Sequence, residues 1–104
     1  MKTFEPDYLK TYCANVIKAS GVDKQVAETV AEMLVDAEVT GVTTHGVSRL
    51  GIYMQRVNAG LVSKENNVRI LHESPAVISI DGGNTFGAAV AQFAMQECIR
   101  KAKE

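Results

Sequence analysis

Three polar residues, His45, Arg49 and Tyr53, follow one another at intervals of four positions. If they lie on one α-helix, the turn of 100° per residue brings their side chains within about 80° of arc, spread over about 12 Å of the axis. A guanidinium binds a carboxylate through two parallel hydrogen bonds, and a neighbouring imidazole can transfer a proton at an adjacent hydroxyl or carbonyl. The spacing therefore predicts a site for a small carboxylic acid that carries a 2-hydroxy or 2-oxo group.

The start of this helix bears on the behaviour of His45. Thr44 is the expected N-cap, with its hydroxyl accepting from the N–H of Val47. His45 would then lie in the first turn, where the positive end of the helix disfavours the imidazolium and attracts an anion. A solvated helix face would show the same polar row, with Arg56 continuing it. A binding site and an ordinary surface both remain open interpretations of the spacing.

Two further helices are expected before this one. Pro6 suits a first helical position, and Gly21 suits the residue after a helix end. Asp23 suits the N-cap of the second helix, which Gly41 closes. The apolar positions expected to face the core are Leu9, Tyr12, Cys13, Val16 and Ile17 in the first helix and Val26, Val30, Met33, Leu34 and Ala37 in the second.

The third helix carries the polar row and ends at Gly60. Gly46 and Gly51 cost it about 1 kcal/mol each relative to Ala, which indicates that something packs closely against it. Its expected core positions are Val47, Leu50, Met54, Val57 and Leu61.

Two short strands and a last helix are expected after the helical part. Residues 68–73 and 77–81 are rich in β-formers, and Ser74 and Pro75 form the turn between them. Thr85 is the expected cap of a helix that runs to Glu104 through Phe86, Val90, Phe93, Ala94 and Ile99. The predicted class is α+β, with three helices over residues 6–61 and a β-hairpin and helix over residues 68–104. Because a lone hairpin is marginally stable, the chain is expected to be a portion of a larger fold or to complete its sheet with a partner.

The composition of the chain argues against several classes of protein. The chain of 104 residues has 46% hydrophobic and 22% charged residues, as an ordinary globular domain has. With 11 basic and 12 acidic residues the net charge is −1, which argues against a nucleic-acid-binding surface. The longest apolar run, residues 88–91, is too short for a membrane span, and the first six residues lack a signal core. Cys13 and Cys98 lack metal-site spacing, so we expect two buried free thiols, no bound metal and a cytoplasmic protein.

Three further patterns could indicate other functions. Residues 81–87 lie between strand and helix, but they match neither phosphate-loop pattern and lack a lysine, so an ordinary turn is expected. His72 has no partner in its strand and is expected to be structural or solvent-facing. Ala37, Gly41 and the Val-Ser-Arg sequence of residues 47–49 resemble a repressor-type helix-turn-helix. The long preceding helix, Gly46 and the absence of a basic cluster argue against DNA binding.

A more specific resemblance covers nearly the whole chain. Residues 38–49, with Tyr53 and residues 58–60, resemble the N-terminal signature of the malate/L-lactate dehydrogenase family, the type 2 group unrelated to Rossmann-fold lactate dehydrogenases. The resemblance continues through residues 78–82, Gly87 and the last helix. It implies an NAD(P)-dependent oxidoreductase that interconverts 2-hydroxy and 2-oxo acids as a homo-oligomer. It further implies that His45 is the active-site histidine, that Arg49 binds the substrate carboxylate and that Tyr53 lines the same pocket.

The chain departs from the family pattern in three ways. Thr44 stands in place of the usual Ser and keeps a hydroxyl. Residues 38–41 read Glu-Val-Thr-Gly in place of Asp-Leu-Arg-Gly, and the loss of that Arg is expected to loosen a structural ion pair. Family members also continue well beyond this length, with another active-site histidine and most of the nucleotide-binding fold. We therefore expect an N-terminal portion that holds part of the substrate site, does not bind NAD or NADP alone and is inactive in isolation. A non-catalytic helical interaction module and a helix-turn-helix protein remain the alternatives.

Overall fold

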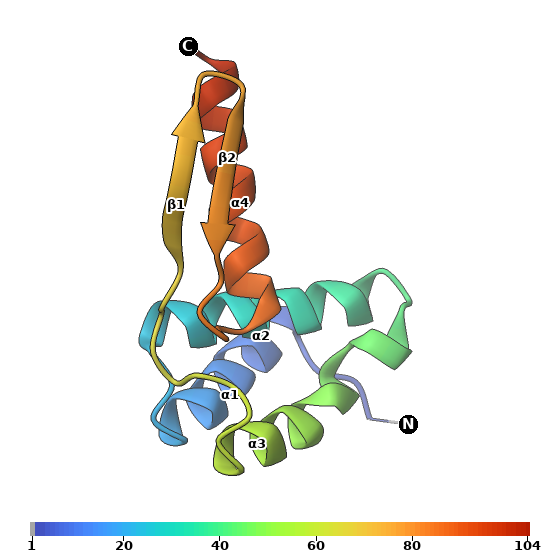
Figure 1. Cartoon of the computed structure of the whole chain (residues 1–104). Coiled ribbons are helices and arrows are strands. Elements are labelled where there is room, and N and C mark those ends of the chain that lie inside the picture. Colours follow the sequence, from blue (N-terminus) through green and yellow to red (C-terminus); the bar gives the residue numbers. More distant parts are fainter. Residues whose placement is uncertain (1) are drawn as a thin grey trace.

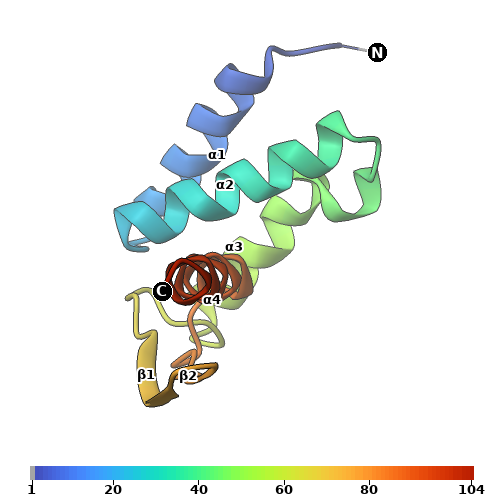
Figure 2. The ribbon, with the colours of Figure 1, turned by 90° about the horizontal axis from the view of Figure 1, so that it is seen from above.

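The computed structural model describes residues 2–104 and has two parts (Figure 1). Helices α1 (Pro6–Ala19), α2 (Lys24–Val39) and α3 (Leu50–Asn58) form the base. Strands β1 (Arg69–Ser74) and β2 (Val77–Asp81) and helix α4 (Gly87–Ala102) extend away from it, with the hairpin running alongside α4. Seen from above, α4 is viewed end-on between α2 and the hairpin (Figure 2). The predicted α+β class is confirmed.

The core lies where α4 meets the base. Its buried members come from α1, α2, α3 and the start of α4, together with the turn before α2: Ile17, Val22, Val26, Ala27, Val30, Leu34, Val57, Phe86 and Ala89. A smaller cluster joins α1 to the other side of α2 through Cys13, Ala14 and Ala31. The last helix is thus anchored in the base by its first turn.

The expected core face of α2 is only partly right. Val26, Val30 and Leu34 are buried, but Met33 is 38% exposed. Since α1 packs against Ala31 while the main core contacts the other side, the buried arc of α2 is rotated away from Met33, which lies at its edge. The periodicity predicted the helix correctly and missed the direction in which its neighbours pack.

Both ends of α2 form as expected. Asp23 Oδ1 accepts from the N–H of Val26 at 3.1 Å. At the other end Gly41 has φ +85°, its N–H donates to Glu38 O at 3.1 Å, and the N–H of Val42 donates to Ala37 O at 2.8 Å. This is a Schellman motif, which satisfies the last carbonyls and ends the helix sharply. The next segment therefore leaves α2 in a fixed direction.

The hairpin is antiparallel and mostly exposed. Its register shifts between Ile70 and His72, and His72 is exposed, in agreement with its expected solvent-facing role. Glu73 attaches β1 to α4 because its Oε1 lies 2.6 Å from Arg100 Nη2 and 2.7 Å from Lys101 Nζ. These two bases hold the pKa of Glu73 below its ordinary value, with the Lys101 hydrogen bond as the largest cause.

Two expectations about the last helix and the thiols are wrong. Thr85 does not cap α4: Phe86 occupies the N-cap, and the buried Thr85 hydroxyl instead accepts from the N–H of Asn67 at 3.0 Å. Cys13 and Cys98 are both free, but only Cys13 is buried. Cys98 is exposed and lines the open hollow between the hairpin tip and the end of α4. In residues 2–104, no helix has the length and apolar character needed to cross a membrane.

Candidate functional site

The expected single helix through His45, Arg49 and Tyr53 is wrong. His45 ends a short 3₁₀ turn, η1 (Thr43–His45), and Arg49 ends a second one, η2 (Val47–Arg49). Helix α3 starts only at Leu50, so Tyr53 alone lies on it. His45 is therefore outside the first turn of an α-helix, and the argument from a positive helix end no longer applies. Residues 47–49 likewise precede α3, whereas the helix-turn-helix comparison would place them on the recognition helix.

Glu38 at the end of α2 explains the break. The N–H of Val47 donates to Glu38 Oε1 at 2.9 Å, so Thr44 is not the cap that the sequence predicted. Gly46 is buried, and a Cβ atom added there would lie 2.6 Å from both Cγ and Cδ of Glu38. The close packing expected at Gly46 is confirmed, whereas nothing lies within 4 Å of a Cβ at Gly51. The Glu38 side chain thus occupies the space beside Gly46, and the chain reverses around it.

His45 and Arg49 are joined through Thr44. Thr44 Oγ1 lies 3.0 Å from His45 Nδ1, and Arg49 Nε donates to the carbonyl oxygen of Thr44 at 2.9 Å. Among residues 2–104, His45 Nε2 and the two terminal amino groups of Arg49 have no hydrogen-bond partner. His45 is exposed and Arg49 half-buried. Thr44 therefore orients both side chains. One ring nitrogen of His45 and the two terminal amino groups of Arg49 remain available to a ligand.

Tyr53 belongs to the edge of the core. Its ring packs on Phe86 with centroids 5.7 Å apart and an interplanar angle of 52°, in a tilted arrangement typical of buried aromatic pairs. Phe86 in turn is the N-cap residue of α4. Tyr53 thus connects the segment that carries His45 and Arg49 to the base of α4.

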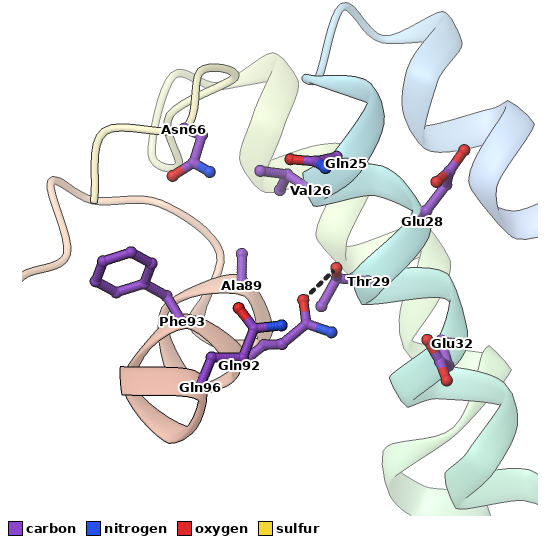
Figure 3. Close-up of a pocket in the computed structure, with 10 residues that line it drawn as sticks. All are labelled: Gln25, Val26, Glu28, Thr29, Glu32, Asn66, Ala89, Gln92, Phe93 and Gln96. Carbon is purple, nitrogen blue, oxygen red and sulfur yellow. Dashed lines mark hydrogen bonds between the residues drawn. The ribbon is translucent and has the colours of Figure 1, made fainter. Parts of the chain in front are cut away.

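Two hollows lie away from these three residues. One of about 370 Å³ separates α2 from α4, and Figure 3 shows the Thr29 hydroxyl donating to Gln92 Oε1 across it, at 2.8 Å. It is lined mainly by amide and carboxylate side chains, from Gln25, Glu28, Glu32, Asn66, Gln92 and Gln96. A second hollow of about 590 Å³ lies between the hairpin tip and the end of α4. His45, Arg49 and Tyr53 line neither of these two hollows.

The turn from β2 to α4 is held by contacts with its own side chains and with Asn67. The N–H of Gly83 donates to Asp81 Oδ1 at 2.9 Å, and this bond, with Arg69 next, lowers the pKa of that carboxyl. A Cβ at Gly83 would lie 2.5 Å from Asn67 Cβ and from its carbonyl oxygen, so Asn67 fills the concave side. The expectation of an ordinary turn is consistent with this packing. Within residues 2–104, no group of three or more His, Cys, Asp or Glu side chains could hold a metal.

Comparison with known proteins shows the family. The family model for malate/L-lactate dehydrogenase matches residues 4–104. L-sulfolactate dehydrogenase of Methanocaldococcus jannaschii is 34% identical over 99 residues, which are 95% of this chain and 29% of that protein. Ureidoglycolate dehydrogenase (NAD(+)) of Escherichia coli K12 is 29% identical over 86% of this chain and 26% of its own length.

The solved structures agree. The malate dehydrogenase of Pyrococcus horikoshii superimposes with a TM-score of 0.93 at 33% identity, covering 98% of this chain and 29% of that one. The fold and the residue pattern together define a member of a hydroxy acid dehydrogenase family. This chain belongs to the malate/L-lactate dehydrogenase family, and it spans between a quarter and a third of the length of the relatives that it matches.

Proposed function

We propose that this chain supplies part of the substrate site of an NAD(P)-dependent oxidoreductase that interconverts 2-hydroxy and 2-oxo acids. The observation that carries the proposal is the arrangement of His45 and Arg49 about Thr44. His45 Nδ1 and Arg49 Nε are hydrogen-bonded to Thr44, which leaves His45 Nε2 and the two terminal amino groups of Arg49 available. The names of the relatives, which are malate, sulfolactate and ureidoglycolate dehydrogenases, support the choice of substrate class.

Arg49 is proposed to bind the substrate carboxylate. Since Nε is already bonded to Thr44 O, the two terminal amino groups remain to donate side by side to the two oxygens of a carboxylate. A planar guanidinium held in this way fixes both the position and the orientation of the acid. The adjacent C2 atom is then directed toward one side of the arginine.

His45 is proposed to hold the proton that moves to or from the oxygen on C2. In reduction, the imidazolium donates its Nε2 proton to the 2-oxo oxygen, and the ring is left neutral with its hydrogen on Nδ1. In oxidation, that neutral ring accepts the proton of the 2-hydroxyl at Nε2 and becomes the imidazolium. In both states Nδ1–H donates to the Thr44 hydroxyl, so Thr44 holds the ring in place while His45 acts in either direction of the reaction.

The nicotinamide cofactor, NAD or NADP, would supply or accept the hydride. The turn at residues 81–87 does not fit its phosphates, because Asp81 and Asn67 occupy the inner side of that turn. Binding of the cofactor is accordingly proposed for an enzyme with additional chain, and residues 1–104 alone are expected to be inactive. Tyr53 is proposed to line the substrate pocket from the side that packs on Phe86.

A homo-oligomer is proposed as the working state. Large apolar side chains are exposed on the hairpin and α4, at Ile70, Leu71, Val77, Met95 and Ile99. Exposed apolar surface of this extent is typical of interfaces. Sedimentation equilibrium should give a mass above that of one chain, and a single-chain mass at the highest soluble concentration would contradict the proposal.

A hybrid enzyme tests the main proposal. Residues 4–104 replace the aligned part of Pyrococcus horikoshii malate dehydrogenase, about 29% of that chain. We expect the hybrid to reduce oxaloacetate with a nicotinamide cofactor and residues 1–104 alone to give no turnover. A hybrid that folds and binds the cofactor but reduces no 2-oxo acid would contradict the substrate role, and turnover by residues 1–104 alone would contradict the partial-site interpretation.

A further inference from the structure

Glu38 contacts the reversal between the two turns that carry His45 and Arg49. Its Oε1 accepts from the N–H of Val47 at 2.9 Å, and its Cγ and Cδ occupy the space beside buried Gly46. Val47 is the first residue of η2, and Gly46 follows the last residue of η1. The Glu38 side chain therefore braces the point at which the chain passes from the histidine turn to the arginine turn from outside the two turns. Within them, the Ser48 hydroxyl donates to Thr43 O at 3.1 Å.

The other bonds of this segment depend on that reversal. The N–H groups of His45 and Gly46 donate to Val42 O and Thr43 O at 3.1 and 3.2 Å. The N–H of Arg49 donates to Gly46 O at 2.9 Å and that of Leu50 to Val47 O, so each 3₁₀ turn is closed by two backbone bonds. Short 3₁₀ turns are weak alone, because their hydrogen-bond geometry is poor. A carboxylate that accepts from a backbone N–H makes a stronger, charge-assisted bond.

Glu38 is itself anchored in a rigid element. It lies one residue before the end of α2, whose preceding turn contributes buried Leu34 and Val35 to the core. Its carbonyl also accepts from the N–H of Gly41 in the motif that ends the helix. The carboxylate thus transmits the position of α2 to the two turns.

We propose that Glu38 is a positioning residue, which sets the separation of the His45 imidazole and the Arg49 guanidinium by fixing the reversal at Gly46. The inference rests on the proposed function, in which this pair binds a 2-oxo acid. In the proposed role, Glu38 touches neither the substrate nor the cofactor. It acts through the backbone of Gly46 and Val47.

A matched pair of substitutions separates the hydrogen bond from the bulk of the side chain. Glu38→Gln keeps the length and an oxygen acceptor for Val47, whereas Glu38→Met keeps the length and removes the acceptor. Glu32→Met is the control, since Glu32 is exposed on the same helix. Hydrogen exchange is measured by NMR on the isotopically labelled chain of residues 1–104, and the core signals of Ile17 check folding. Oxamate, an unreactive analogue of a 2-oxo acid, is titrated into the hybrid enzyme with its cofactor.

In Glu38→Met we expect the Val47 N–H and the Arg49 Nε–H to exchange with solvent at least about tenfold faster, and oxamate to bind about tenfold more weakly, as the loss of a charge-assisted bond implies. Glu38→Gln should show a smaller loss of about threefold on both measures, since its amide oxygen still accepts from Val47 but without the charge. Unchanged exchange and affinity in Glu38→Met, or equal losses in both variants, would overturn the positioning role. If oxamate does not bind the unmodified hybrid enzyme with its cofactor, the proposed function fails, while the exchange of Arg49 Nε–H in residues 1–104 still decides the positioning role.

Discussion

Arg49 Nε donates to the carbonyl oxygen of Thr44 at 2.9 Å, and this bond joins the arginine to the turn that carries His45. Because the donor is a side chain and the acceptor is a backbone atom, the guanidinium is held relative to the main chain of its partner. A lysine has one ammonium group, which cannot both bond Thr44 O and present a two-pronged donor to a carboxylate.

Arg49→Lys in the hybrid enzyme should therefore raise KM for oxaloacetate by about tenfold to a hundredfold, since a charge-assisted hydrogen bond contributes about 1.5–3 kcal/mol. Steady-state kinetics measure the change. Arg56→Lys, which alters an exposed arginine on α3, should leave KM within about twofold. An unchanged KM in Arg49→Lys would remove Arg49 from the substrate role.

The elements whose signals are local in the sequence could be predicted from it. Asp23, Gly41, Pro75 and the periodic apolar positions act locally, through capping, turn conformation and helix periodicity, and the elements that they predict are present. The break at Gly46 depends on Glu38, eight residues earlier and across a helix end. The spacing of apolar residues along the chain gives no sign of the contact between Glu38 and Gly46.

The candidate site shows the same limit. The types of residue at positions 45 and 49 pointed to carboxylate binding and proton transfer, and that chemistry does not depend on their lying on one helix. The predicted geometry of the two side chains did depend on one continuous helix. That geometry was wrong, because a helical wheel assumes that the helix is continuous. Glu38 could have been noticed as an acidic residue just before a helix end and near a glycine corner, but only the folded chain shows which N–H it accepts from.

Thr44→Val should lower kcat of the hybrid by about tenfold, since loss of one hydrogen bond to the imidazole costs on the order of 1 kcal/mol and leaves the ring free to turn. Valine matches threonine in shape and removes only the hydroxyl that lies 3.0 Å from His45 Nδ1. Thr44→Ser keeps the hydroxyl and should retain kcat within about twofold. Equal activity of the valine and serine variants would show that the contact does not orient His45.

Two glycines give opposite predictions for stability. Gly46→Ala places a Cβ 2.6 Å from Glu38 Cγ and Cδ and should lower the free energy of unfolding by about 1–3 kcal/mol. Gly51 lies in α3 with open space around it. Gly51→Ala should raise the free energy of unfolding by about 0.5–1 kcal/mol, because alanine favours the helix. Urea unfolding followed by circular dichroism measures both. Stabilisation by Gly46→Ala would contradict the close approach of Glu38.

The attachment of the hairpin to α4 should weaken in acid. Hydrogen bonds from Lys101 and then Arg100 lower the pKa of Glu73 in the folded state from its ordinary 4.5. A carboxyl with a depressed folded pKa stabilises the protein above its unfolded pKa, and this contribution is lost as the pH falls through the folded value. Stability should therefore decline as the pH is lowered from 5 through the depressed pKa of Glu73.

Glu73→Gln removes this contribution, so its melting temperature should fall less steeply below pH 5 than that of the unmodified chain. Glu28→Gln, at an exposed position on α2, should keep the original acid profile. Thermal unfolding at a series of pH values compares the three proteins. Parallel curves for Glu73→Gln and the unmodified chain would show that Glu73 does not link β1 to α4 in solution.

The two thiols should react at very different rates. Cys98 is exposed near the end of α4, whereas Cys13 has no exposed surface, and burial raises its pKa. The thiolate is the reacting form, so both lower access and a higher pKa protect Cys13. Iodoacetamide at pH 8 should modify one thiol per folded chain quickly and the second only after denaturant is added, and Cys98→Ser should abolish the fast phase. Fast modification that survives in Cys98→Ser would mean that α1 separates from α2 readily enough to expose Cys13.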